Sequence, residues 1–384
     1  MNVEQIYSLV NSINKQLWGE NALTVNDLSG LIALGDTVFS SANNRDMFLN
    51  TLVDRIGKTV IRNLDLEVEF PNFIKNEMEF GCILQKVNIQ ISDAQECRAW
   101  EIGDNDFVPN QFKIDKPVIR QSLFTNFVTW EYDLTVSDIM YRSSFTSATE
   151  MGVFIEGMTR AQSDALTLAL NNLAHASLCN FIAEKSKKYN NGFVNLYYLY
   201  KQAYPLSTLT ATQALESPTP EFLKFAGMIM RNYVGYLGKP SKLFNTEGML
   251  RATARDNLHV ILSQDFFSAY TTMLSADTFH SEMVALPLFD SYTTLQATGT
   301  TAPNIIDNTK INVKPSSGGD ALEISGIVGI YLDREAIGTT YRDIYTGTDR
   351  NNRNRYTNYT TSATLGMFND TSENAVIFVI QAYE

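Results

Sequence analysis

The chain has 384 residues and a formal net charge of −12, with 30 Lys and Arg against 42 Asp and Glu. This acidic balance argues against tight, direct binding to a phosphate backbone, because such binding depends on Lys and Arg that neutralise phosphates. It does not argue against a container whose negative inner wall repels nucleic acid. Only three His and three Cys accompany 22 Phe and 18 Tyr, a composition that suits broad β surfaces and protein contacts better than a catalytic pocket.

Residues 1–63 are predicted to form a helical N-terminal arm. Its first part carries apolar residues at the spacing of one helix face, and a second amphipathic piece, RDMFLNTLVDRIGKTVIRNL, follows the polar stretch SSANN. The first apolar face consists of Ile6, Leu9, Val10, Ile13 and Leu17.

Residues 64–136 change to the period of two that is typical of half-buried strands. The two strand candidates are CILQKVNIQIS and SLFTNFVTWEYDLTV, and the segment between them is polar and interrupted by Gly103, Pro109 and Pro117. Two long strands with an irregular tip predict an extended β-arm, which has too little core to be stable alone and needs a neighbouring molecule. We expect the aromatic residues near its tip to anchor a subunit interface; the alternative is an arm that folds back on its own core. These candidate interface residues are Trp100, Phe107 and Phe112.

Residues 137–204 are dominated by one very long predicted helix. Ser147 and Glu150 have the spacing of a capping box, and apolar residues then recur at about 3.5-residue steps to about residue 187. About 40 residues at 1.5 Å each give a helix of roughly 60 Å.

Residues 205–303 are predicted to form a compact mixed unit. Thr219 and Pro220 suit the N-cap and first position of a helix, LHVIL and VALPLFD have the character of buried strands, and QDFFSAYTTMLS that of a helix. Residues 304–384 return to strands: INVKP, EISGIVGIYL and the final AVIFVIQAY, with a short helix expected in DREAIGTTYRD.

The residues that most often carry chemistry give no catalytic, metal or cofactor pattern. His175, His259 and His280 match no HExxH or triad spacing, and neither GxxxxGK[ST] nor GxGxxG is present. His175 is expected to face outward from the long helix, and His259 to be a satisfied strand histidine. His280 with Asp277 and Glu282 could hold a metal ion, but we favour the interpretation that these residues form a polar cluster at a helix end. We therefore expect no enzyme activity and no cofactor.

The cysteines and the N-terminus bear on the cellular compartment. Cys82, Cys97 and Cys179 are odd in number and lack CxxC spacing, which favours free thiols in a reducing cytoplasm. No basic segment followed by an apolar run begins the chain, and no run of about 18 apolar residues occurs in it, so we expect neither a signal peptide nor a membrane span.

One basic cluster interrupts the acidic chain. The segment TGTDRNNRNRYTNYTT contains Arg350, Arg353 and Arg355 next to Tyr356 and Tyr359. Its leading interpretation is a charged contact with the acidic surface of a neighbouring subunit. A solvated loop is the second interpretation, and a nucleic-acid contact is the third.

The order of these elements resembles that of the major capsid proteins of tailed bacteriophages. Two local stretches resemble the capsid proteins of the small short-tailed phages related to phi-twenty-nine. The first is RATARDNLHVILSQDFFSAYTTMLSADTFHSEMVALPLFD. The second is the C-terminal part from YLDREAIGTTYRD to ENAVIFVI, whose last apolar strand begins near Asn374 and Ala375.

This resemblance implies an α+β fold of the Hong Kong 97 type. The corresponding parts would be an N-terminal arm (1–63), an extended E-loop (64–136), a P-domain with the spine helix (137–204), an A-domain (205–303) and strands returning to both domains (304–384).

The resemblance also implies a function and a set of partners. The implied protein is a major capsid protein that assembles into an icosahedral head, as pentamers and hexamers, around double-stranded DNA that it does not bind sequence-specifically. Portal and scaffolding proteins would be partners, and the virion, assembled in the host cytoplasm, would be its location. The alternative is an encapsulin-type nanocompartment that holds enzymes, and a soluble enzyme is a distant third.

Overall fold

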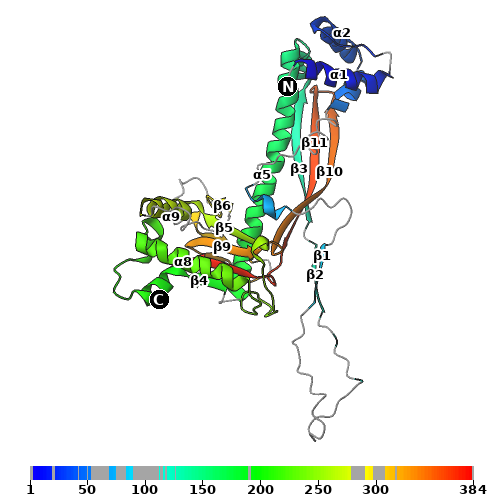
Figure 1. Cartoon of the computed structure of the whole chain (residues 1–384). Coiled ribbons are helices and arrows are strands. Elements are labelled where there is room, and N and C mark those ends of the chain that lie inside the picture. The colour runs from blue at the N-terminus through cyan, green and yellow to red at the C-terminus, as the bar shows by residue number, and fades with distance from the viewer. Residues whose placement is uncertain are drawn as a thin grey trace.

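The computed structural model describes residues 3–19, 22–41, 43–49, 51–52, 69–74, 84–89, 112, 116, 119–125, 127–188, 192–277, 290–296, 308–315 and 318–382. One long helix, α5 (Ala148–Lys188), connects three parts: a helical cap at its N-terminal end, a three-stranded sheet along its middle and an α/β unit at its C-terminal end (Figure 1). Within the described part of the chain, no helix is both long and apolar enough to cross a membrane.

Helix α5 begins where the sequence predicted it. The Ser147 hydroxyl caps it by accepting a hydrogen bond from the backbone N–H of Glu150 at 3.1 Å, and its 41 residues extend over roughly 60 Å. The helix buries a different apolar group in each part of the molecule: Met151 and Ile155 in the cap, Leu166 against the three-stranded sheet, and Phe181 in the α/β unit. The helix therefore fixes the distances between the cap, the three-stranded sheet and the α/β unit.

The helical cap consists of α1 (Val3–Trp18), α2 (Leu28–Phe39), the helical residues 43–49 and 51–52, and α4 (Asp138–Ser144). As predicted, the periodic face of α1 packs inward, since Ile6, Val10 and Ile13 are fully buried. Helix α2 was not anticipated as a separate element, although Asp27 caps it by accepting the N–H of Gly30 at 2.8 Å.

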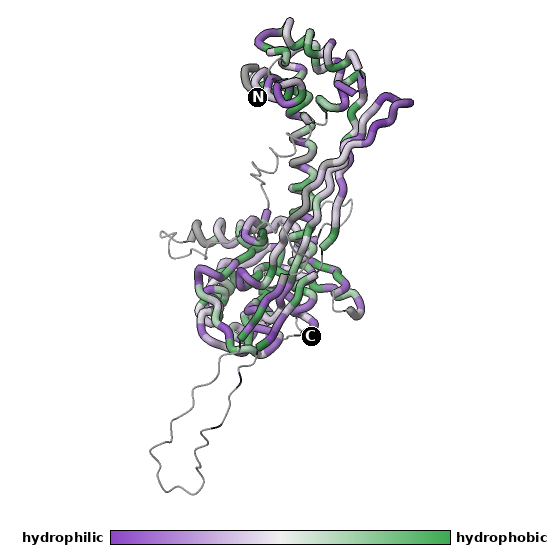
Figure 2. The backbone as a smooth tube through the Cα atoms, turned by 90° about the vertical axis from the view of Figure 1, so that its right-hand side faces the viewer, coloured by the Kyte–Doolittle hydropathy of each residue, from purple (hydrophilic) through white to green (hydrophobic). Residues whose placement is uncertain are grey.

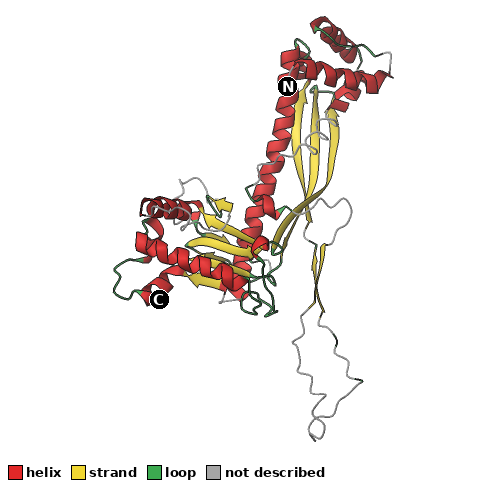
Figure 3. Cartoon of the chain, viewed as in Figure 1, coloured by secondary structure: helices red, strands yellow, loops and turns green. Residues whose placement is uncertain are grey.

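The three-stranded antiparallel sheet lies beside α5 in the order β10 (Ile337–Asn351), β11 (Tyr356–Asn369), β3 (Phe127–Ser137) (Figure 3). Ala363 and Leu365 of β11 are buried against α5. The opposite face is polar and has hydrogen bonds between strands, such as the one from the Thr135 hydroxyl to Asn358 Oδ1 at 2.7 Å. One face therefore packs on the helix while the other faces solvent.

The α/β unit contains a five-stranded mixed sheet. Its order is β4 (Phe193–Asn195), β12 (Ala375–Val379), β9 (Ile327–Asp333), β5 (Leu258–Ser263), β6 (Asp290–Tyr292). One face packs on the C-terminal part of α5, and the other is covered by four helices. These are α6 (Leu196–Ala203), α7 (Ala211–Glu216), α8 (Pro220–Leu237) and α9 (Gln264–Asp277).

Strand β12 is the final strand of the chain, and every one of its residues is buried. It lies between β4, to which it is parallel, and the antiparallel β9. The short elements β7 (Ile311–Val313), β8 (Leu322–Ile324), η2 (Pro71–Phe73) and η4 (Arg255–Asn257) complete the fold.

Two expectations about elements were wrong. The segment SLFTNFVTWEYDLTV is not one strand: β2 (Ile119–Phe124) pairs with β1 (Leu84–Ile89), whereas β3 starts at Phe127 and pairs with β11. The expected helix in DREAIGTTYRD is a turn followed by β10. The N–H of Ala336 bonds to the carbonyl of Asp333 at 2.8 Å, and the β-branched and glycine residues that follow pair with β11. The strand expected in VALPLFD falls mostly outside the described residues.

Candidate assembly site: the hairpin arm and its anchor

The β1–β2 hairpin presents its apolar side to solvent and its polar side to its own chain. Four apolar side chains on it are 50–64% exposed, whereas Lys86 and Ser122 on the opposite side are half-buried. The exposed ones are Val87, Ile89, Ile119 and Leu123. Such an orientation reverses the usual partition of polar and apolar residues and leaves a surface suited to another molecule.

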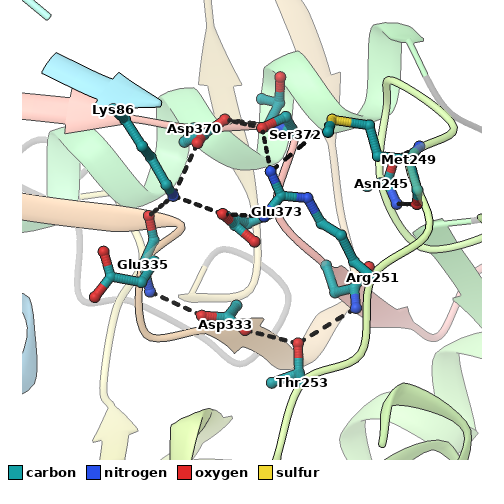
Figure 4. Close-up of polar contacts among 12 residues, drawn as sticks. Lys86, Asn245, Met249, Arg251, Thr253, Asp333, Glu335, Asp370, Ser372 and Glu373 are labelled. Atoms are coloured by element: carbon teal, nitrogen blue, oxygen red, sulfur yellow. Dashed lines mark hydrogen bonds and ion pairs between the residues drawn. The ribbon is translucent and has the colours of Figure 1, made fainter. Parts of the chain in front are cut away.

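The polar side of the hairpin is held by ion pairs. Lys86 Nζ lies 2.9 Å from Asp370 Oδ2 and 2.6 Å from Glu373 Oε1, and it donates a hydrogen bond to the carbonyl oxygen of Glu335 at 3.2 Å (Figure 4). Both carboxylates are nearly fully buried and belong to the turn between β11 and β12. The ion pairs therefore connect the base of the arm to the place where the two larger sheets meet.

The ionisation of this cluster follows from its surroundings. Burial disfavours the charge on Asp370, but Lys86 and the hydrogen bonds from Ser372 outweigh it and hold the pKa of Asp370 below its usual value. Burial likewise works against the charge on Lys86, yet Asp370 and Glu373 raise the pKa of Lys86. Lys86 and Asp370 are therefore both charged at neutral pH.

The α/β unit also contacts the turn between β11 and β12. Arg251 pairs with the Glu373 carboxylate, and its Nη2 donates to the Ser372 hydroxyl at 3.4 Å. Close by, the Thr253 hydroxyl donates to Asp333 Oδ2 at 2.7 Å (Figure 4). The residues between β11 and β12 thus join the arm, the three-stranded sheet and the α/β unit.

A fully buried lysine completes this cluster. Lys185, near the end of α5, donates hydrogen bonds from Nζ to the carbonyl oxygens of Phe244 at 2.8 Å, Glu373 at 3.1 Å and Thr371 at 3.4 Å. Burial lowers the pKa of Lys185 to about 7, although the carboxylates of Asp370 and Glu373 act in the opposite direction. Sequence reasoning missed Lys185, Lys86 and their partners, because ion pairs between distant segments leave no spacing pattern.

The aromatic residues expected at the arm tip are only partly described. Trp100 and Phe107 lie outside the described residues. Phe112 is described and its side chain is 84% exposed within the isolated chain.

The three arginines divide into two groups. Arg350 is mostly buried and pairs within its own chain with Asp46 at 2.6 Å and Asp138 at 3.4 Å, so it ties β10 to the helical cap. Arg353 and Arg355 are exposed on the β10–β11 turn, which Figure 2 marks as hydrophilic. The ion pairs of Arg350 therefore lie within its own chain and require no neighbouring subunit.

Apolar surface of α4 lies beside the end of the β10–β11 hairpin. The backbone N–H of Asp138 donates to the carbonyl of Arg355 at 3.0 Å, which places the start of α4 against the turn. The next two residues, Ile139 and Met140, are 82% and 56% exposed. Tyr359, which the sequence placed beside the arginines, is instead fully buried in the cap.

The histidines hold the segment 69–74 in place. The expectation that His175 faces outward was wrong: its Nε2 lies 2.6 Å from Glu69 Oε2, and its ring packs edge-on against Phe70. His259 is a buried strand histidine, as the sequence predicted, with Nε2 2.5 Å from Asp290 Oδ2. The expectation that it is fully satisfied is wrong, since its Nδ1 has no hydrogen-bond partner among the described residues.

The remaining candidates add no catalytic or metal site. His280 and Glu282, weighed for a metal, lie outside the described residues, and the described residues contain no cluster able to hold one. Cys82 and Cys97 also lie outside them. Cys179 is a buried free thiol whose pKa is raised by burial.

Comparisons with known proteins identify the fold. A capsid structure of Staphylococcus phage Andhra superimposes with a TM-score of 0.56 at 9% identity, covering 83% of this chain and 86% of that one. A chain from the structure of head fiber and inner core protein gp22 of native bacteriophage P68 gives 0.52 at 13% identity, covering 82% and 85%. The expected Hong Kong 97-type fold is thereby confirmed.

No curated protein sequence matches the chain. The family model described as "Phi29-like phage major capsid protein" matches residues 10–379, which is nearly the whole chain. The chain therefore belongs to the family of Phi29-like phage major capsid proteins.

Proposed function

We propose that many copies of this major capsid protein build an icosahedral head, as pentamers and hexamers, around double-stranded DNA. The family is one of structural capsid proteins, which favours a phage head over an encapsulin-type compartment and over an enzyme. The chain's net charge of −12 suits a wall that encloses DNA without binding it tightly. Portal and scaffolding proteins are its proposed partners, and assembly takes place in the host cytoplasm.

The observation that carries this proposal is the exposed apolar face of the β1–β2 hairpin. Its polar face is occupied by Lys86 and the buried carboxylates, so the arm cannot turn its apolar residues inward without breaking those ion pairs. A neighbouring copy is the surface that buries them in a shell. Trp100, Phe107 and Phe112 are proposed to extend the same contact toward the tip.

The same reasoning assigns roles to the other parts. Residues 1–63 act as the N-terminal arm, 64–136 as the E-loop, 137–204 as the spine and P-domain, and 205–303 as the A-domain, to which residues 304–384 contribute strands. Arg353 and Arg355, beside exposed apolar residues of α4, are proposed to contact an acidic surface of an adjacent copy. Arg350 is proposed to support that contact indirectly by fixing the turn.

Electron microscopy of the expressed full-length chain tests the shell. Closed particles are expected from the chain, with the portal and scaffolding proteins co-expressed if the chain alone does not close. Replacing residues 93–118 with a short Gly-Ser turn tests the arm. The shortened chain should remain soluble and unfold cooperatively but form no closed shells, whereas normal shells from it would refute the role of the arm.

A further inference from the structure

The loop that follows α6 presents a fixed apolar turn to solvent. Leu206 is 97% exposed and Tyr204 is 54% exposed, with Pro205 between them. The turn is held by a hydrogen bond from the Ser207 N–H to the Tyr204 carbonyl at 3.1 Å, and Lys201 Nζ bonds to the Ser207 carbonyl. We refer to residues 204–206 as the YPL turn.

A hollow of about 700 Å³ lies between β4, α6 and the C-terminal end of α8. Its walls are mainly apolar and aromatic, and Tyr236 and Leu243 are 52% and 56% exposed. The main lining residues are Phe193, Tyr198, Leu199, Tyr233, Tyr236 and Leu243. Its volume is sufficient for several side chains.

The YPL turn does not lie in this hollow in its own chain. The turn shares a separate hollow with Glu221, in the first turn of α8, whereas Tyr236, in the last turn of that helix, lines the hollow described above. The 15 residues between them span roughly 22 Å at 1.5 Å per residue. A second copy could therefore seat its turn against Tyr236 at the C-terminal end of α8, which the turn of the same chain does not contact.

The charges beside the two features are complementary. Glu221 is exposed next to the YPL turn, and Lys239 is exposed where it lines the hollow. A contact that seats the turn of one copy in the hollow of another would bring this Glu and Lys toward each other. Because the contact joins two different surfaces, it is head-to-tail and can repeat around a ring.

We propose that the YPL turn of each subunit inserts into the β4–α8 hollow of the next subunit and so links neighbouring α/β units around a capsomer. This inference rests on the proposed shell function, because it needs copies arranged in rings. It concerns a surface separate from the hairpin arm. The partner is therefore a second copy of this chain.

Engineered disulfides test the contact in assembled particles. Leu206→Cys combined with Leu243→Cys should, after mild oxidation, give a ladder of covalent species beyond the dimer on a non-reducing gel. A bond within one chain would add nothing to the ladder, because it joins no second chain. The single-cysteine variants and Leu206→Cys with Leu168→Cys, which lies 61% exposed on α5, are the controls.

Charge reversal supplies a second readout on the same two-cysteine chain. Glu221→Lys or Lys239→Glu alone should reduce the yield of the ladder several-fold, and the combined reversal should restore it. Intact shells that give no cross-links, or dimers only, would overturn the ring contact and leave the shell function standing. Failure of the unmodified chain to form any shell, even with the portal and scaffolding proteins co-expressed, would instead overturn the proposed function.

Discussion

Lys86 and Glu373 lie 2.6 Å apart although they come from opposite halves of the chain. The pair joins the first strand of the arm to the turn that precedes the final strand. Lys86 also contacts Asp370, so one cation serves two nearly buried carboxylates. Lys86 therefore helps to set the direction in which the arm leaves the body of the subunit, together with Arg120 of β2, which pairs with Glu247.

Replacing Lys86 should destabilise the chain and release the arm. Lys86→Met leaves Asp370 buried without its nearest cation, and we expect the free energy of unfolding to fall by about 1–3 kcal/mol. Urea unfolding of the unassembled chain measures this. Adding Asp370→Asn should recover part of the loss, because it removes the unpaired charge. Equal stability of Lys86→Met and the wild type would show that the ion pairs do not hold the arm.

A charge on the exposed face of the hairpin should block assembly without unfolding the subunit. Ile89→Asp and Leu123→Asp change side chains that are 64% and 56% exposed in the isolated chain, so their cost to the fold is expected within about 0.5 kcal/mol. Particle yield by electron microscopy should fall sharply. Ile89→Val is the matched control. Normal particles from both Asp variants would count against a buried hairpin face.

Replacing Arg350 should lower the stability of the unassembled subunit. Arg350→Met removes the link from β10 to Asp46 and Asp138, and we expect a loss of about 1–3 kcal/mol in the free energy of unfolding. Thermal unfolding of the unassembled chain provides the measurement. No change in the subunit's unfolding would indicate that Arg350 acts elsewhere.

Replacing Arg353 and Arg355 should lower the stability of the assembled particle but not that of the subunit. Exposed ion pairs contribute about 0–1 kcal/mol each, but a contact repeated over a shell accumulates. Replacing both with Ser should leave the unfolding of the subunit unchanged and lower the salt concentration at which particles dissociate. Identical salt sensitivity of variant and wild-type particles would favour a solvated turn.

Lys185 should make stability depend on pH above neutrality. Its folded-state pKa is about 7, whereas the unfolded chain keeps this proton up to about 10.5. The unfolded state therefore binds more protons between these values, and the contribution of Lys185 to stability rises with pH across that window. The wild type should gain stability relative to Lys185→Met between about pH 7 and 9.5. Parallel curves for the two chains would contradict the lowered pKa.

The regular elements were the predictable part of this fold. The N-cap residue Ser147 and the apolar periodicity predicted α5 correctly, because both signals are local in the sequence. The break between β2 and β3 was missed because the apolar pattern continues across it, and only their different partners separate them. The Arg350 contacts and the cluster around Lys185 also depend on segments far apart in sequence, which a single sequence does not connect.

Strand β12 has a consequence for how each subunit is made. The parallel strand β4 and the antiparallel strand β9 both have β12 as their neighbour, and β12 is synthesised after both of them. A nascent chain cannot complete the central sheet before residues 375–379 emerge. Products of translation that stop before residue 375 therefore lack β12 and cannot complete this sheet, so we expect incomplete subunits not to join a shell.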